Sequence, residues 1–428
     1  MFERPVIDPR CVLVSLDIGA RDAASHAEFE ELARSAGAEV VARVGGHRVS
    51  PEPKYFVGTG KAEEIRAVVQ EAGAGLVLVN HPLSPSQERN LEALIQCRVL
   101  DRTGLILDIF AQRARSFEGK LQVELAQLRH LATRLVRGWS HLERQKGGIG
   151  LRGPGETQLE SDRRLLRARV DQLERRLVRV GRQRAQGRAL RQRSAVPTVA
   201  LVGYTNAGKS TLFNALAGAT AYAADQLFAT LDPTARQLDL GTLSVVLVDT
   251  VGFVRDLPHE LVAAFRATLE ETRQADLLLQ VVDASDPEAD LQQAAVAEIL
   301  AQIEADEIPR LLVFNKIDLV DWPAEIRRDG MGDPVAVHLS AHTGAGLEEL
   351  RSAVQQYFQG RSACQWLHLA HAEGGIRARL YAAGAVRAER IEDDGWWLQV
   401  EGPPDRLAEM IRKPVDGGLA VAPTTGHP

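Results

Sequence analysis

Cysteine is scarce in this chain of 428 residues, and its few cysteines are widely separated. The three are Cys11, Cys97 and Cys364. Because the three are far apart in sequence, they suit reduced thiols in the interior of a cytoplasmic protein better than a disulfide framework or a cysteine-based metal site.

Long apolar runs and a secretory leader are also missing. No stretch of about 18 or more apolar residues occurs, so we expect no membrane span. The first five residues, Met1 to Pro5, lack a signal-peptide pattern. With 45% hydrophobic and 25% charged residues, the composition is that of a folded soluble protein, and the length predicts two to four domains.

Positive charge is concentrated in one segment. The whole chain has a net charge of −6, but residues 111–195 contain 21 Lys and Arg against 8 Asp and Glu, so the rest of the chain carries −19. Nineteen of those 21 basic residues are arginine. This asymmetry indicates contact with a nucleic acid or another anionic surface through residues 111–195.

The same segment shows two helical patterns that predict an antiparallel hairpin of two long helices. In the first half, apolar residues alternate at spacings of four and three, at Leu121, Leu125, Leu128, Ala132, Leu135 and Trp139. In the second half, their spacing is consistent with a heptad seam, at Leu159, Leu166, Val170, Leu173, Leu177 and Val180. The expected tip is the glycine-rich stretch Gly147–Gly155, because five glycines in nine residues oppose a helix.

Two interpretations of the arginines are open: a solvated helix face, or a surface that binds RNA. Twelve arginines lie in residues 161–195, with too few acidic residues to pair with them. Arginine also suits phosphate forks and base stacking better than lysine does. With Lys146 and Arg152 at the tip, we favour RNA binding.

The central third of the chain contains a phosphate-binding loop between an apolar strand pattern, residues 197–202, and a helix pattern, Thr211–Ala217. Its sequence is Gly203-Tyr204-Thr205-Asn206-Ala207-Gly208-Lys209-Ser210. Glycines let backbone N–H groups surround phosphate oxygens at a helix N-terminus. We expect Lys209 to reach the β- and γ-phosphates and the Ser210 hydroxyl to bind Mg²⁺.

Two further segments predict a nucleotide-dependent switch. Asp249-Thr250-Val251-Gly252 follows the strand pattern of residues 245–248, so we expect Asp249 to hold Mg²⁺ and the Gly252 amide to sense the γ-phosphate. The other segment is Phe228-Ala229-Thr230-Leu231-Asp232-Pro233-Thr234. A threonine there can bind Mg²⁺ when GTP is present; we choose Thr230, with Thr234 as the alternative.

The last two motifs select the base. Asn315-Lys316-Ile317-Asp318 follows a strand pattern, and a carboxylate at Asp318 can accept two hydrogen bonds from guanine, which discriminates by roughly 10⁴. The other is Ser340-Ala341-His342-Thr343-Gly344, whose backbone would contact the guanine O6. Five motifs in this order predict a GTPase that binds GTP and GDP with Mg²⁺, with Lys209, Thr230 and Gly252 as catalytic residues.

Residues 1–110 predict a small α/β domain with a mostly parallel sheet. We expect strands at 11–18, 39–44, 76–80 and 99–100, and helices at 24–35, 61–72 and 86–95. Within it, Gly58-Thr59-Gly60-Lys61 imitates half of a phosphate-binding loop. No strand precedes it and no Ser or Thr follows Lys61, so we interpret it as a helix start.

The fold class is therefore α/β and multidomain. We place an N-terminal α/β domain at 1–110, a basic helical hairpin at 111–195, a doubly wound GTPase domain at 196–360 and a small α+β domain at 361–428. In the last, we expect helices at 375–382 and 404–411 and strands at 385–391 and 396–400. Trp396 and Trp397 should face opposite sides of a strand.

These motifs, together with Gly153-Pro154-Gly155-Glu156-Thr157-Gln158-Leu159-Glu160, resemble the HflX family of GTPases. The resemblance implies binding to the ribosome, chiefly to rRNA of the large subunit, through the hairpin and its glycine-rich loop. It also implies a part in splitting stalled ribosomes after heat or antibiotic stress. Ser210 and Thr230 carry over as Mg²⁺ ligands. We expect a cytoplasmic protein that is a monomer when free.

Two residues refine the expected mechanism. Phe253 stands where many switch GTPases have a glutamine that orients the attacking water, so we expect slow intrinsic hydrolysis and stimulation by a partner. Asn206 occupies the position of an asparagine in potassium-activated GTPases, so K⁺ is a candidate cofactor; the alternative is that Asn206 caps the loop. The rival functions are an RNA-remodelling NTPase with a second, N-terminal nucleotide site, and a signalling GTPase with a protein effector.

Overall fold

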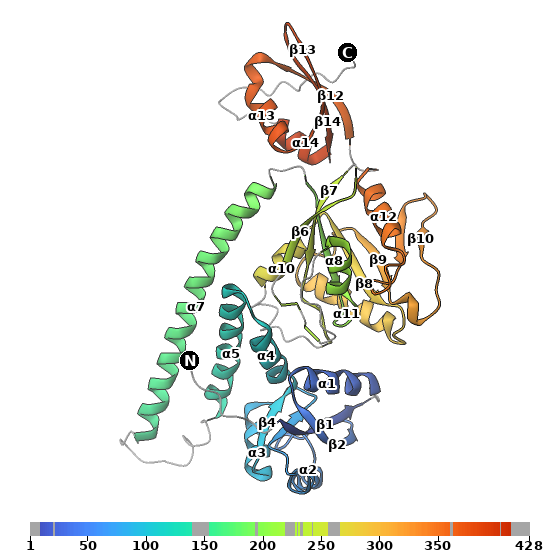
Figure 1. The fold of residues 1–428 in the computed structure, drawn as a ribbon. Coiled ribbons are helices and arrows are strands. Elements are labelled where there is room, and N and C mark those ends of the chain that lie inside the picture. The colour runs from blue at the N-terminus through green and yellow to red at the C-terminus, as the bar shows by residue number, and fades with distance from the viewer. Residues whose placement is uncertain are drawn as a thin grey trace.

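The computed structural model describes residues 9–19, 22–138, 154–192, 196–218, 227–228, 230–231, 234–241, 243–255, 266–359, 363–402 and 404–411. The expected multidomain α/β organisation is confirmed (Figure 1). We call its four parts the N-terminal domain, the hairpin, the central domain and the C-terminal domain. Among the described helices, none is long and apolar enough to cross a membrane.

The N-terminal domain contains a sheet of four parallel strands in the order β2-β1-β3-β4. The strands are β1 (Arg10–Ile18), β2 (Glu39–Arg48), β3 (Leu76–Val79) and β4 (Arg98–Asp101), and the first helices are α1 (Ala23–Ser35), α2 (Thr59–Ala72) and α3 (Pro85–Ile95). Helix α2 begins directly after Gly58, so the Gly58-Thr59-Gly60-Lys61 sequence is a helix start, as expected.

Helix α4 (Arg102–Arg113) was not predicted from the sequence. Eight of its twelve residues are buried, so it lacks the polar face that makes an amphipathic helix visible in a sequence. It begins at Asp101, whose side chain accepts a hydrogen bond from the Gly104 N–H at 2.8 Å. This N-cap fixes the first turn of α4 at the carboxyl end of β4.

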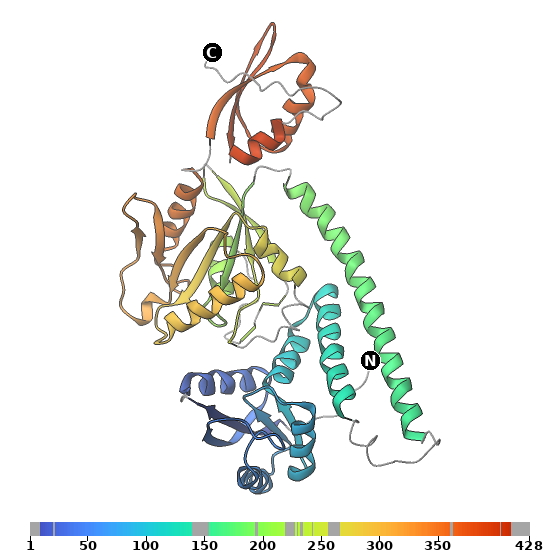
Figure 2. The ribbon, with the colours of Figure 1, turned by 180° about the vertical axis from the view of Figure 1, so that it is seen from behind.

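The hairpin consists of α5 (Phe117–Gly138) and α7 (Pro154–Gln192), packed side by side (Figure 2). Its apolar seam agrees with the predicted one: Leu121, Leu125 and Leu173 are buried, and Leu128, Val170 and Leu177 pack against them. Two ion pairs also join the helices, Arg169 with Glu124 at 2.6 Å and Arg129 with Glu174 at 2.7 Å.

One boundary of the hairpin differs from the expectation. Pro154 and Gly155, which we assigned to the tip, form the first turn of α7. Proline is favoured at the first helical position because its missing N–H would have no partner there. Residues 147–153, including Arg152, and Lys146 lie outside the described residues, as do the side chains of Leu135, Trp139 and Leu159.

The central domain is built on a seven-stranded mixed sheet in the order β10-β11-β9-β8-β5-β7-β6. Five strands are parallel, and β6 and β10 are antiparallel edges. The strands are β5 (Thr198–Gly203), β6 (Thr234–Asp239), β7 (Ser244–Asp249), β8 (Leu277–Asp283), β9 (Arg310–Asn315), β10 (Glu325–Arg328) and β11 (Pro334–His338). Its helices are α8 (Lys209–Ala217), α10 (Arg266–Arg273), α11 (Ala289–Gln302) and α12 (Leu347–Gln359).

The C-terminal domain is a three-stranded antiparallel sheet in the order β12-β14-β13. Its elements are β12 (Ala363–Ala370), α13 (Gly374–Ala382), β13 (Val386–Glu392), β14 (Gly395–Gly402) and α14 (Pro404–Ile411). Strand β12 was not predicted. Trp396 packs against the core of this domain, whereas Trp397 lies beside His368, 5.0 Å between ring centroids.

Candidate nucleotide-binding site

The predicted motifs converge where β5, β7, β9 and β11 reach their carboxyl ends, the usual ligand site of an open α/β sheet. The loop between Gly203 and Lys209 joins β5 to α8. Gly208 has φ +93°, and a Cβ there would lie 2.2 Å from Asn315 Nδ2. Only glycine therefore fits at this point of close approach.

Lys209 is buried beneath this loop. Its Nζ donates to the carbonyl oxygens of Gly203 at 3.0 Å and Tyr204 at 2.6 Å. Burial lowers the pKa of the Lys209 ammonium to about 8, and the carboxylate of Asp249 opposes that shift. An anionic ligand in the loop would favour the charged form of this lysine.

Three oxygen-bearing side chains meet next to Lys209. The Ser210 hydroxyl lies 2.8 Å from Asp249 Oδ2 and 2.6 Å from the Thr230 hydroxyl, which itself lies 2.8 Å from Asp249 Oδ2. Asp249 Oδ1 is buried without a hydrogen-bond partner among the described residues. Burial raises the pKa of Asp249, and hydrogen bonds from Ser210 and Thr230 oppose the rise.

This group of oxygens fits Mg²⁺. The ion prefers hard oxygen ligands and usually keeps several waters, so a carboxylate and two hydroxyls are a suitable donor set. A cation would also satisfy the buried Asp249 Oδ1. Thr230, not Thr234, reaches this group, because Thr234 already belongs to β6.

Gly252 packs closely against Thr205 of the phosphate-binding loop and against Lys209. A Cβ on Gly252 would come within 2.7 Å of Thr205 Cγ2 and 3.1 Å of Lys209 Nζ. The absence of a side chain therefore lets the Gly252 backbone approach the position where Lys209 would hold a γ-phosphate. The next residue, Phe253, is buried and pairs with the loop through backbone hydrogen bonds.

The base-selecting motifs form the opposite end of the pocket. Asn315 ties two segments together, donating to the Ala207 carbonyl and accepting from the Ala341 N–H, both at 2.9 Å. Lys316 pairs with Asp283 at 2.7 Å. Asp318 is exposed and has no hydrogen-bond partner among the described residues, so its carboxylate is available to a ligand.

Most of the predicted site residues line one pocket: Thr205, Asn206, Gly208, Lys209, Ser210, Thr211, Phe228, Thr230, Thr250, Gly252, Asn315, Lys316, Asp318, Ser340, Ala341 and His342. Seven others are buried and do not line it: Gly203, Tyr204, Ala207, Leu231, Asp249, Val251 and Ile317. Ala229 and Asp232 lie outside the described residues. Leu319 also lines the pocket and was not predicted; its place directly after the Asp318 motif was the available signal.

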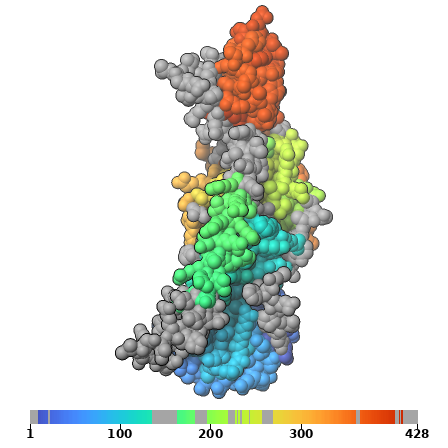
Figure 3. Space-filling model, turned by 90° about the vertical axis from the view of Figure 1, so that its left-hand side faces the viewer, coloured from blue at the N-terminus to red at the C-terminus, as the bar shows by residue number. Residues whose placement is uncertain are grey.

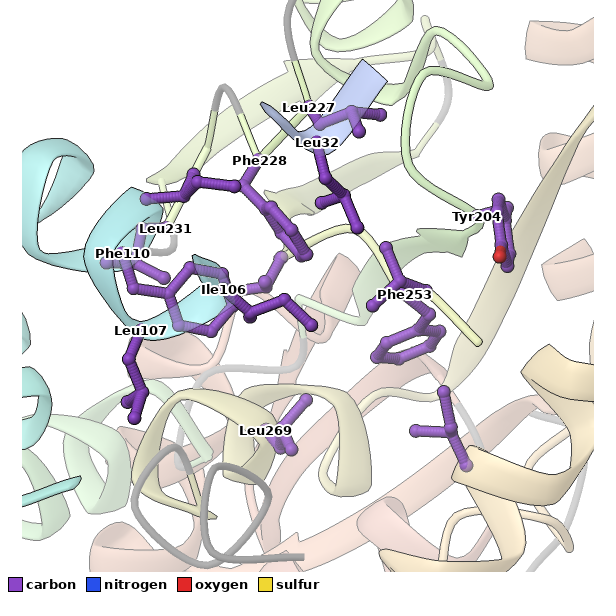
Figure 4. Close-up of a cluster of buried hydrophobic side chains, with 14 of the residues drawn as sticks. Leu32, Ile106, Leu107, Phe110, Tyr204, Leu227, Phe228, Leu231, Phe253 and Leu269 are labelled. Atoms are coloured by element: carbon purple, nitrogen blue, oxygen red, sulfur yellow. The ribbon is translucent and has the colours of Figure 1, made fainter. Parts of the chain in front are cut away.

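The N-terminal domain reaches this site as well, which the sequence did not indicate. Glu31 of α1 accepts a hydrogen bond from the Asn206 side-chain amide at 3.3 Å. Neither Tyr204 nor Phe253 lines the pocket: both belong to the buried cluster that includes residues of the N-terminal domain (Figure 4), and the Tyr204 hydroxyl donates to Glu28 of α1.

Three family models match the chain in succession. They are described as GTP-binding GTPase N-terminal, over residues 23–111, GTP-binding GTPase Middle Region, over residues 113–191, and 50S ribosome-binding GTPase, over residues 198–316. Together they span the N-terminal domain, the hairpin and most of the central domain.

Curated relatives match over most of their length. The GTPase HflX of Escherichia coli is 58% identical over 398 residues, which cover 92% of this chain and 93% of that protein. The GTPase HflX of Magnetococcus marinus is 46% identical, with 90% of this chain and 89% of that protein covered. A GTP-binding protein from Sulfolobus solfataricus, solved with GDP, is 24% identical over 81% of this chain and 97% of that one, with a TM-score of 0.43.

Proposed function

The chain belongs to the HflX family of GTPases, and we propose that it binds the large ribosomal subunit. GTP would control this binding, and the bound protein would help to split or rescue stalled ribosomes. Its enzymatic activity is the hydrolysis of GTP. The observation that carries the site assignment is the convergence of Lys209, Ser210, Thr230, Asp249 and Asp318 around one pocket.

The roles of the site residues follow from their positions. The loop amides and Lys209 would bind the phosphates, Asp318 the guanine base, and the Gly252 amide the γ-phosphate. Ser210, Thr230 and Asp249 would hold Mg²⁺, which supplies positive charge where the phosphates become more negative during transfer. Thr230 and Gly252 belong to separate segments. Because GTP with Mg²⁺ would contact both residues, its binding would order both segments.

The attacking water lacks a side chain of the usual kind to orient it. The Phe253 side chain has no hydrogen-bonding group, and it is buried in the apolar cluster that residues of both domains form. We therefore propose slow hydrolysis by the free protein and faster hydrolysis on the ribosome.

Potassium is a further candidate cofactor through Asn206. Its amide nitrogen donates to Glu31, which leaves its oxygen available to a cation near the phosphates. A bound K⁺ would add transition-state charge. Hydrolysis rates in KCl and NaCl of equal ionic strength test this: we expect the higher rate in KCl, and equal rates would show that Asn206 only shapes the loop.

The hairpin supplies a surface suited to RNA. Six arginines on the described part of α7 are exposed and form no ion pair with another described residue: Arg164, Arg167, Arg175, Arg176, Arg179 and Arg182. Helix α7 lies along the outside of the molecule (Figure 3). Exposed guanidinium groups of this kind bind phosphate oxygens.

Cosedimentation with ribosomes tests the proposal. Binding should be stronger with a non-hydrolysable GTP analogue than with GDP, and it should weaken steeply with salt, because RNA contacts release counterions. Ribosome binding that changed neither with the nucleotide nor with the salt concentration would contradict the proposal. A parallel test uses Lys209→Ala: if hydrolysis persisted at the normal rate, with ATP also consumed, a second nucleotide site in the N-terminal domain would be the better account.

A further inference from the structure

The N-terminal domain packs directly onto the two segments that would respond to the γ-phosphate. Figure 4 shows Leu32, Ile106, Leu107 and Phe110 of α1 and α4 in one cluster with Leu227, Phe228, Leu231 and Phe253 of the central domain. The rings of Phe110 and Phe228 meet edge to face, with 4.5 Å between centroids. The two domains therefore share one apolar core at this point.

A polar chain crosses the same interface. The Tyr204 hydroxyl donates to Glu28 Oε2 at 2.6 Å and accepts from the Arg255 N–H at 2.9 Å. Arg102 donates to Glu28 Oε1 at 2.5 Å and to the Arg255 carbonyl at 3.2 Å. Arg102 of the N-terminal domain thus binds the Arg255 carbonyl directly. Glu28 of the same domain is connected to the Arg255 N–H through the Tyr204 hydroxyl.

The pair is too deeply placed to be a surface ion pair. Only 5% of the Arg102 side chain and 11% of the Glu28 side chain are exposed. Burying two charges is costly unless their hydrogen-bonding groups are satisfied, and several of their partners here belong to the central domain. The bonds from Arg102 to Arg255 and from Tyr204 to Glu28 therefore form only when the two domains are in contact, whereas Arg102 Nε has no partner among the described residues.

Arg255 lies three residues after Gly252, and the chain between them is held tightly to the loop. The Phe253 N–H donates to the Gly203 carbonyl at 3.1 Å, and the Thr205 N–H donates to the Phe253 carbonyl at 2.7 Å. A displacement of Arg255 would therefore be transmitted to the Gly252 amide. In the role proposed above, GTP would need that amide in place, whereas GDP, which lacks the γ-phosphate, would not.

We propose that Glu28, Arg102 and Tyr204 are positioning residues that set the preference for GTP over GDP by fixing the chain from Gly252 to Arg255. The inference rests on the nucleotide roles proposed above. Binding free energies are reciprocal, so GTP in turn tightens the contact between the N-terminal and central domains. The N-terminal domain is then the part of the molecule that reports which nucleotide is bound.

The test compares Glu28→Gln and Arg102→Lys with Glu30→Gln as a matched control. Glu30 lies on the same helix but pairs with the exposed Arg34 and Arg43 of its own domain, and the structure shows no hydrogen bond from it to a described residue of the central domain. The measurement is the dissociation constant of the full chain for GDP and for a non-hydrolysable GTP analogue. We expect the analogue-to-GDP affinity ratio to fall about fivefold or more in both interface variants and to stay unchanged in the control.

A double-mutant cycle of Glu28→Gln with Tyr204→Phe adds a readout that a merely structural role would not move. Because the two residues act through one chain of hydrogen bonds, their effects on the ratio should not add. Equal weakening of both nucleotides, or an unchanged ratio in variants with normal thermal unfolding, would overturn the inference. If Glu28→Gln did not fold, the ratio for Tyr204→Phe, which loses a single hydroxyl, would decide. An unaltered chain that bound neither nucleotide would instead refute the proposed site.

Discussion

At the scale of single residues, burial and the surrounding polar groups distinguish the side chains that act on a ligand. Lys209 and Asp249 are almost completely buried, and each lies beside polar groups that an ion or a phosphate would complete. Asp318 is the opposite case, an exposed carboxylate with no partner among the described residues. These contrasts allow the binding of phosphates and the recognition of the base to be tested separately.

Asp318→Asn should reduce GTP affinity by about 100-fold or more and permit binding of xanthosine triphosphate. The amide replaces one acceptor by a donor, which clashes with guanine and suits xanthine. Competition binding with both nucleotides measures this. Asp321→Asn, an exposed neighbour outside the pocket, is the control; an unchanged guanine preference in Asp318→Asn would show that another group recognises the base.

Nucleotide binding should take up a proton at alkaline pH. In the free protein burial lowers the pKa of Lys209 to about 8, and phosphates would raise it again. Below pH 8 the lysine is charged in the free and in the nucleotide-bound protein, so its ionisation should not make the affinity depend on pH. Above pH 8 binding must protonate it, and GDP affinity should fall by up to about tenfold per pH unit. Calorimetry at pH 7 to 9, in buffers of different ionisation enthalpy, measures the uptake; uptake that stays constant over this range would contradict the assignment.

At the scale of elements, the hairpin divides its arginines between two tasks. Arg129 and Arg169 pair across the seam and help to hold α5 against α7. The exposed arginines of α7 contribute nothing comparable to the hairpin. Their positive charges repel one another, and an anionic partner bound to them would offset that repulsion.

Neutralising Arg164 and Arg167 with glutamine should weaken ribosome binding and reduce its salt dependence. For each RNA phosphate that the variant no longer binds, the slope of log affinity against log salt should fall by about one. Cosedimentation over a range of salt concentrations measures the slope. The control is Arg169→Gln, which removes an arginine already paired with Glu124. If both variants kept the normal slope, α7 would be a structural support and would not bind the RNA.

At the scale of the whole molecule, ion pairs of one arginine, Arg134, join the hairpin to the N-terminal domain. Arg134 of α5 lies 2.9 Å from Asp101 and 3.0 Å from Glu88. Only 2% of the Asp101 side chain is exposed. Burial raises the pKa of Glu88 to about 7, and the charge of Arg134 opposes the rise. The direction of the hairpin therefore depends on a buried polar cluster as well as on apolar packing.

Arg134→Met should destabilise this junction by about 3–5 kcal/mol, because it leaves the buried Asp101 without its charged partner. Arg129→Met is the matched control: it removes a half-exposed pair from the same helix and should cost at most about 1 kcal/mol. Hydrogen exchange in α3 and α5 reports the local opening. Equal protection in the two variants would show that apolar packing alone holds the hairpin.

The nucleotide motifs were visible in the sequence because each is contiguous and its chemistry depends on local backbone shape. A loop such as Gly203 to Ser210 adopts its conformation from its own glycines and from the strand and helix that flank it. The hairpin seam was visible for a similar reason, since a helical repeat places its apolar residues on one face. The choice between Thr230 and Thr234 needed the structure, because it depends on where β6 begins.

Other features arose only from tertiary contacts. Helix α4 is buried on most sides, so it carries no periodic signal, and β12 forms its hydrogen bonds with β14, about 30 residues further along the chain. The hydrogen bonds from Tyr204 to Glu28 and from Arg102 to Arg255 join residues 176 and 153 positions apart, and no local pattern marks them. The sequence alone determined that this protein binds and hydrolyses GTP. Only the folded molecule decided that the N-terminal domain rests on the switch segments, because that contact depends on how separate elements pack.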